Sequence, residues 1–147
     1  MSLHQEPIKS IVDVNDNRFL APSNMTEEVK RACAESRQQV PDSIAQIAAV
    51  IYNSLAECYA STVKEIEGLT HKNYEYIHIV GGGANAGYLN ELTANATRKT
   101  VYAGPTEATA IGNIASQMIA DGKLKDLKAA RRCIFDSFEI KEYNPDL

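Results

Sequence analysis

The sequence predicts an α/β fold that is rich in helix and has only a small sheet. An apolar run at residues 76–80 is typical of a buried strand, and three glycines follow it at once. An amphipathic segment comes next, and Thr100–Ala103 predicts a second short strand. Strand, glycine turn and helix is the order in which α/β proteins bring their backbone close to a nucleotide. The fold is therefore predicted to be organised around the glycine turn.

Length, charge and hydropathy exclude several classes of protein. The 147 residues suit one domain, expected over residues 4–147, with residues 1–3 as a cloning leader. A net charge of −4, without a run of basic residues, argues against a nucleic-acid-binding surface. Because no apolar stretch reaches the length of a membrane helix and no signal-peptide core is present, we expect no membrane association.

Cysteines and histidines show no pattern of a metal site. Cys33, Cys58 and Cys133 are widely spaced and odd in number, which fits neither a zinc site nor a disulfide framework. A reducing cytoplasm is therefore the expected compartment. His78 alternates with Ile77, so we expect it to point to the other face of its strand.

The first third of the chain is predicted to hold an extended opening and a short helix. The opening spans residues 4–25 and contains a strong turn signal at residues 15–17. A helix is expected from Thr26 to about Arg37, with Asn24 or Thr26 as its cap. Turns and helix caps also account for three aspartates that might otherwise suggest catalysis: Asp13, Asp16 and Asp42.

The longest predicted element is a helix that follows Pro41. Asp42 or Ser43 is its expected cap, and it is expected to end near Gly68. Apolar residues recur at helical spacing along it: Ile44, Ile47, Ala48, Ile51, Leu55, Tyr59, Val63 and Ile66.

Four elements are predicted after the glycine turn. In chain order they are a helix ending near residue 98, the strand Thr100–Ala103, a helix from residue 105 or 106 to residue 121, and a short helix over residues 125–135. Residues 138–143 then alternate in polarity. Two parallel strands make a poor sheet alone. We therefore expect this C-terminal segment or the opening to add a strand, or the chain to be a piece of something larger.

Three interpretations of Gly81, Gly82 and Gly83 are considered from the residues alone, and one of them is excluded. A strand-to-helix turn needs positive φ and close packing, which glycine supplies without any ligand. A dinucleotide fold is the second, because residues 81–86 fit G-x-G-x-x-A, although no acid follows the next strand at the distance that a ribose contact needs. The third is a P-loop, and it is excluded because no Gly-Lys-Ser/Thr follows.

Several further motifs occur in a fixed order along the chain. They are VNDNRFLAP at residues 14–22, VPDS at 40–43, IYNSLA at 51–56, IHIVGGGANAGYLN at 77–90 and GPTEATAIGN at 104–113. Together they resemble the C-terminal ATP-binding domain of the FGGY carbohydrate kinases, in the actin-like ATPase superfamily. The resemblance covers about residues 8–145, which is nearly the whole chain.

The resemblance implies a partial ribonuclease-H-like domain with an incomplete sheet. It also implies a site for ATP, with Mg²⁺ in the intact enzyme, which transfers phosphate to a ketose such as L-rhamnulose. The residues implied to bind the nucleotide are Gly81, Gly82, Gly83, Ala84 and Asn85. Gly82 is the strongest single candidate, because a Cβ there would hold the backbone away from the nucleotide.

The family's remaining functional parts are not matched in this chain. In such kinases the phosphate-gripping turn, most sugar contacts and the proton-accepting aspartate precede the matched region. We therefore expect the chain alone to be inactive, because phosphoryl transfer needs all these groups positioned together. An exposed sheet edge further predicts self-association.

An alternative is a non-catalytic remnant or interaction module with the same fold and little ATP affinity. Ala86 stands where the family pattern GGGxxN has its asparagine, and Asn85 lies one place earlier. Asn95 and Arg98 replace the aspartate and glycine of the family's ADxxG stretch. These departures favour the alternative, whereas the intact glycine run favours nucleotide binding.

Overall fold

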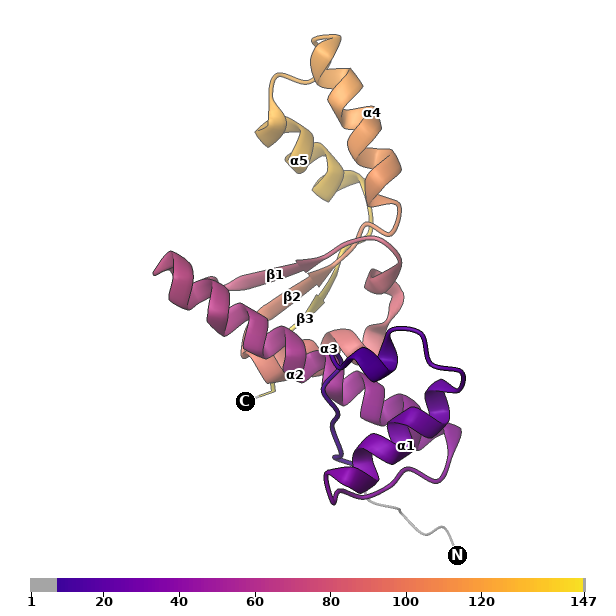
Figure 1. Cartoon of the computed structure of the whole chain (residues 1–147). Helices are drawn as coiled ribbons and strands as arrows, with labels where there is room; N and C mark the ends of the chain where they lie inside the picture. Colours follow the sequence, from indigo (N-terminus) through magenta and orange to yellow (C-terminus); the bar gives the residue numbers. More distant parts are fainter. Residues whose placement is uncertain (1–7, 147) are drawn as a thin grey trace, which may run out of the picture. The chain divides into compact units, whose positions relative to one another are not determined.

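A computed structural model describes residues 8–146 (Figure 1). The chain divides into two compact units, which we call the N-terminal unit (Met1–Lys72) and the C-terminal unit (Asn73–Leu147). The leader expected at residues 1–3 lies outside the described residues.

In the described residues 8–72, the N-terminal unit contains two α-helices and one turn of 3₁₀ helix. These elements are η1 (Asn17–Phe19), α1 (Met25–Glu35) and α2 (Ile44–Thr70). The caps are the predicted ones, since Asn24 Oδ1 accepts from the Glu27 amide at 3.3 Å and Ser43 Oγ accepts from the Gln46 amide at 3.3 Å. The long helix α2 passes through Gly68 and ends two residues beyond it. Its terminator is His71, which takes the left-handed conformation that glycine more often takes after a helix.

The core of the N-terminal unit lies where α1, α2 and the opening meet. Its buried members are Ile8, Val29, Cys33, Ile47 and Val50. Burial raises the pKa of the Cys33 thiol, because the thiolate loses its hydration there. Cys33 is thus a packing residue. Ile44, by contrast, was expected on the inward stripe of α2 and is 88% exposed at the first position of the helix.

The opening segment is held by side chains rather than by a strand ladder. Gln38 mimics a strand partner, because its Oε1 accepts from the Ile11 amide at 2.9 Å and its Nε2 donates to the Ile11 carbonyl at 2.7 Å. The Val12 amide donates to Ser54 Oγ at 2.9 Å. Within residues 8–24 the opening contains no strand, so of the two segments expected to add one, the opening does not do so in the residues described.

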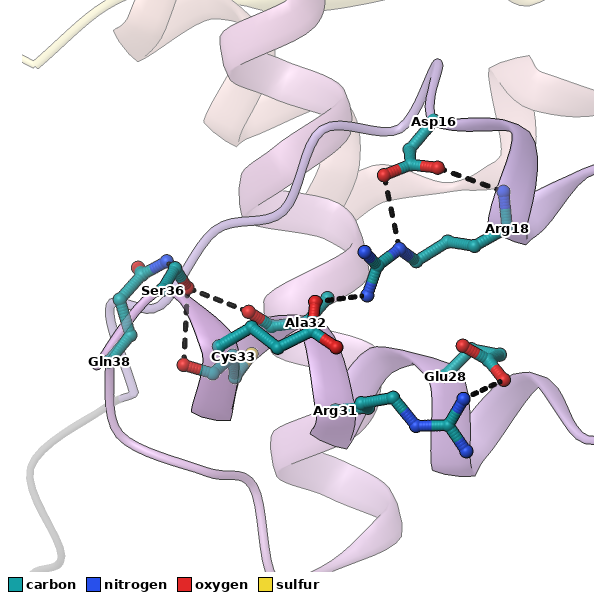
Figure 2. A network of polar contacts seen from close by, with 9 residues as sticks. Asp16, Arg18, Glu28, Arg31, Ala32, Cys33, Ser36 and Gln38 are labelled. Carbon is teal, nitrogen blue, oxygen red and sulfur yellow. Dashed lines mark hydrogen bonds and ion pairs between the residues drawn. The ribbon is translucent and has the colours of Figure 1, made fainter.

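A polar network joins the opening to α1 (Figure 2). Asp16 caps η1 by accepting from the Arg18 amide at 2.9 Å, and its second oxygen accepts from Arg18 Nε at 3.0 Å. Arg18 also pairs with Glu35 of α1 at 2.8 Å. The bond from the Arg18 amide, followed by the guanidinium, lowers the pKa of Asp16. Asp16 is therefore a cap, as expected, and it is also an ion-pair residue.

Replacing Asp16 by asparagine is expected to destabilise the N-terminal unit at neutral pH and to have less effect in acid. Because the folded-state pKa is lowered, the stabilisation is fully present above the unfolded-state pKa of about 4. It is lost as the pH falls through the lowered pKa. Urea unfolding of both proteins at neutral pH and near pH 3 measures this difference. Glu27→Gln, which breaks an exposed ion pair of α1 with Lys30, is the control. A wild-type-to-variant difference that is equal at both pH values would contradict the prediction.

Over residues 73–146, the C-terminal unit contains a three-stranded sheet and three α-helices. Its elements are β1 (Tyr76–Ile79), η2 (Gly82–Asn85), α3 (Gly87–Thr97), β2 (Thr100–Ala103), α4 (Ala108–Ala120), α5 (Leu127–Ser137) and β3 (Lys141–Tyr143). The strand order is β1-β2-β3. β1 and β2 are parallel, and β3 pairs antiparallel with β2. The expectation that the C-terminal segment adds a strand is confirmed.

Each face of this sheet has a different character. Val101 and Ala103 of β2 are buried, and α3 contacts β2 and β3. The opposite face carries aromatic rings, because His78 stacks on Tyr102 with ring centres 5.5 Å apart, and Tyr76 lies 5.6 Å from the same ring. His78 is exposed while its neighbours Ile77 and Ile79 are half-buried, so its predicted orientation is confirmed.

The last two helices begin two or three residues later than predicted. Glu107 is the residue before α4 rather than part of its first turn, and its side chain makes no capping bond. In α5 the start is set by Asp126, whose Oδ1 accepts from the Ala129 amide at 2.8 Å. The two helices lie side by side, coloured orange and yellow in Figure 1, and Ile114 of α4 remains 58% exposed. Across residues 8–146, no helix combines the length and the apolar character that a membrane crossing requires.

Candidate functional site

The carboxyl ends of β1 and β2 lie side by side, and the loops that follow them are bonded together. The Gly104 amide donates to the Ile79 carbonyl at 2.8 Å, and the Gly81 amide donates to the Pro105 carbonyl at 3.0 Å. The glycine turn is thus held against the start of the GPTEATAIGN motif. In open α/β sheets, ligands bind outside this edge of the strands.

The three glycines of the turn differ in what the fold requires of them. Gly81 has φ +77° and ψ −160°, a conformation that only glycine adopts readily. At Gly82 an added Cβ would meet no atom within 4 Å, and at Gly83 it would make an ordinary 3.7 Å contact with Ile79. Neither Gly82 nor Gly83 has a positive φ. Backbone geometry therefore accounts for one glycine of the three, and leaves two exposed glycines without a packing reason.

The backbone of the turn is fixed from behind by a buried asparagine. Ala84 is buried in η2, and its carbonyl accepts from Asn90 Nδ2 of α3 at 3.1 Å. The Ala84 amide donates to the Gly81 carbonyl at 3.0 Å, which closes the turn. Asn90 is itself fully buried. These hydrogen bonds hold the backbone that carries the exposed glycines, and they need no ligand to do so.

Next to the turn lies a small polar hollow of about 150 Å³. It is lined by Ala84, Asn85, Ala103, Gly104, Pro105, Thr106, Phe138, Glu139 and Lys141. Of the predicted site residues, Ala84 and Asn85 line the hollow, and Gly81, Gly82 and Gly83 form the turn that leads into it. Pockets for whole small molecules are usually about 300–1,000 Å³. This hollow has room for part of a nucleotide, such as a phosphate or a ribose.

Thr106, Glu139 and Lys141 are lining residues that sequence reasoning missed. Thr106 lies inside the GPTEATAIGN motif, where the sequence indicates only a helix that starts at residue 105 or 106. Glu139 and Lys141 lie far along the chain, and the alternating pattern of residues 138–143 was their only signal. The antiparallel register, which sets Lys141 opposite Ala103, brings them to the site.

The family pattern has its asparagine at the position of Ala86, whereas this chain has Asn85 one place earlier. Neither of these two positions lies in an α-helix. Asn85 is the last residue of η2, and α3 begins at Gly87, so Ala86 sits in the break between them. Asn85 lines the hollow and is exposed, whereas Ala86 is the uncapped residue before α3. The asparagine that is present therefore belongs to the lining of the hollow.

Two other residues that differ from the family pattern, Asn95 and Arg98, lie at the C-terminal end of α3. Asn95 and Arg98 both bind Asp146, because Asn95 Oδ1 accepts from its amide at 2.7 Å and Arg98 donates to its carbonyl at 2.7 Å. Arg98 also takes the left-handed conformation that ends the helix. A helix of 11 residues is about 16 Å long, so these contacts lie away from the glycine turn.

Within the described part of the chain, no three His, Cys, Asp or Glu side chains gather as a metal site would need. Asp13 accepts from the Asn15 amide at 2.9 Å, as a turn residue does. Asp42 precedes the capping Ser43. Mg²⁺ in nucleotide sites is commonly held by the phosphates and water with one or two carboxylates.

Comparison with protein families identifies this chain's relatives. The model of the FGGY family of carbohydrate kinases, C-terminal domain, matches residues 2–120. The match includes the glycine turn, η2, α3, β2 and α4, and it ends before α5 and β3.

Several curated proteins similar to this chain are named rhamnulokinase. A rhamnulokinase of Bacillus subtilis is 46% identical over 140 residues, which are 95% of this chain and 29% of that protein. A rhamnulokinase of Halalkalibacterium halodurans is 47% identical over 92% of this chain and 29% of its own length. One of Enterococcus faecalis is 47% identical over 96% of this chain and 30% of its own. The chain thus spans less than a third of the relatives it matches.

Proposed function

The chain belongs to the FGGY family of carbohydrate kinases, as their C-terminal domain, and from this premise we propose that it is the nucleotide-binding part of a rhamnulokinase-like enzyme. The intact enzyme would transfer phosphate from ATP to the primary hydroxyl of a ketose such as L-rhamnulose. Because the chain belongs to this family, we no longer interpret the glycines as part of a dinucleotide fold.

One observation about the glycine turn supports this proposal above all others. Gly82 and Gly83 are exposed at the carboxyl edge of parallel strands, and their own fold leaves room for a side chain at both positions. Glycine at such a position is explained when a ligand must approach the backbone closely. A nucleotide is the ligand that ties this position to the kinase family.

The nucleotide would use the turn and the hollow together. Backbone amides of the turn and the uncapped start of α3 would face the phosphates, because helix N-termini attract anions. Asn85 would offer its amide to the nucleotide from the rim of the hollow. Mg·ATP supplies the transferred phosphate and its own metal. Because the hollow is small, much of the nucleotide would rest on open surface or on parts of a full-length kinase beyond this match.

The fold of the C-terminal unit is proposed to be part of a ribonuclease-H-like domain. Parallel β1 and β2 with α3 between them in sequence fit that architecture, and β1 is an edge of the sheet with Tyr76 52% exposed. An edge of this kind would pair with a further strand of a longer kinase, or with another copy of the chain. The self-association expected from the sequence stays a prediction.

The chain by itself is proposed to bind nucleotide without phosphorylating sugar. Positioned phosphates, metal and a nucleophile are needed together, and this chain corresponds to about 29% of each relative's length. The cytoplasm is the proposed compartment, which the free thiols of Cys33, Cys58 and Cys133 support.

The remnant or interaction module remains the second candidate. Ala86 favours it, because the family's asparagine is missing at the position before α3. The two functions differ in one property, which is affinity for ATP.

A calorimetric titration of Mg·ATP and of ADP into the full chain tests the proposal. Saturable one-to-one binding is expected, with NMR shifts of the amides of Gly82 and Asn85 on addition of nucleotide. A coupled assay with L-rhamnulose and Mg·ATP should give no turnover. If circular dichroism shows a folded chain and no binding occurs up to millimolar nucleotide, the remnant function is the correct one.

A further inference from the structure

The segment between α5 and β3 runs directly over the end of β2. A Cβ added at Gly104 would come within 2.6 Å of the Glu139 carbonyl oxygen, so the two backbones are in close contact. In the antiparallel register, Lys141 lies opposite Ala103, the last residue of β2. Directly opposite residues of an antiparallel pair share one face of the sheet. Lys141 therefore stands on the face of Ala103, at the edge where the nucleotide is proposed to bind.

Among the described residues that line the hollow, Lys141 is also the only one with a cationic side chain. Ala84 and Asn85 line the same hollow from the glycine turn. Lys141 is exposed, and no hydrogen bond or ion pair occupies its ammonium group in the described part of the protein. A net charge of −4 makes the chain as a whole repel a polyphosphate, so a local cation is needed to offset that field.

We infer that Lys141 binds a phosphate group of the nucleotide, and that residues 138–141 form one wall of the nucleotide site. This inference rests on the proposed function. It places a site residue beyond residue 120, where the match to the family model ends. Lysine suits the role because its ammonium is a compact charge on a flexible stem, which can follow a phosphate without a fixed geometry.

Glu139 lines the same hollow and carries the opposite charge. Its carboxylate would repel a phosphate placed beside it, so the phosphate must lie on the Lys141 side, towards β3. A ribose hydroxyl is a suitable neighbour for Glu139, because a carboxylate accepts hydrogen bonds from it. The polarity of the hollow thus orients the nucleotide as well as attracting it.

The test compares three variants of the full chain by calorimetric titration with Mg·ATP, ADP and adenosine at low and moderate salt. Lys141→Gln is expected to weaken ATP and ADP binding about tenfold or more, as loss of a charged hydrogen bond does. It should leave adenosine affinity unchanged and reduce the salt dependence of ATP binding. Lys141→Arg should keep most of the affinity. Lys128→Gln, at an exposed position of α5, is the matched control and should change ATP affinity less than twofold.

Each other outcome overturns the inference in a recognisable way. If wild-type chain binds nucleotide and Lys141→Gln binds it equally well, the inference fails and the proposed function stands. Equal losses for ATP and adenosine would give Lys141 a purely structural role, which also overturns it. If wild-type chain, shown to be folded, binds neither ATP nor ADP, the inference and the proposed function fail together.

Discussion

Replacing Gly82 by valine is expected to abolish measurable Mg·ATP binding while the chain stays folded. The fold itself has room for the side chain, because a Cβ at Gly82 would meet no atom within 4 Å. Valine is therefore expected to change the free energy of unfolding by less than about 1 kcal/mol. A nucleotide lying on the turn would collide with the branched side chain, and a loss of about 100-fold or more in affinity follows from displacing the phosphates or adenosine.

The experiment separates binding from folding by measuring both on each protein. Calorimetry gives the affinity for Mg·ATP, and urea unfolding gives the stability. Gly68→Val is the matched control, since it makes the same substitution at a glycine of α2 that also has no atom within 4 Å of an added Cβ. It should leave the affinity unchanged. Nucleotide binding that survives Gly82→Val would place the site elsewhere on the chain.

Local signals were sufficient to predict most secondary structure. Ser43 and Asn24 cap helices in the structure because their oxygens reach the free amides of a first turn, which is a property of a few neighbouring residues. β2 has the predicted bounds, Thr100–Ala103, because a short apolar run between a helix end and Gly-Pro leaves little alternative. The helix C-termini that moved are those of α1 and α2, where Arg37 and His71 adopt the left-handed conformation although neither is glycine.

The candidate site was predicted only in the part that is contiguous in sequence. Gly82 and Asn85 belong to one turn, and a recognisable motif marks them. Lys141 is separated from Asn85 by more than fifty residues, and only the register of β3 on β2 brings them to one hollow. The sequence also does not show why each position has glycine, because φ and the space around a Cβ are properties of the folded backbone.

Replacing Gly104 by alanine is expected to have the largest effect on stability of any single change considered. Gly104 has φ +132°, a conformation that residues with a Cβ rarely adopt. The added methyl would also lie 2.6 Å from the Glu139 carbonyl oxygen and 3.4 Å from Ile140 Cα, and a backbone cannot yield as a side chain does. Backbone strain and the collision together are expected to cost about 3 kcal/mol or more.

Measurements on Gly104→Ala can separate a loss of overall stability from a local loss of pairing between β2 and β3. Urea unfolding should show the loss of stability, and hydrogen exchange should show that the paired amides of β2 and β3 lose protection first, because the collision separates residues 138–141 from Gly104. Gly112→Ala is the control, since nothing lies within 4 Å of an added Cβ there and alanine favours the helix by about 1 kcal/mol. An unfolding midpoint of Gly104→Ala equal to that of wild type would show that this segment moves freely over the end of β2. In that case Lys141 would no longer be held at the hollow, and the wall assigned to residues 138–141 would have no fixed position.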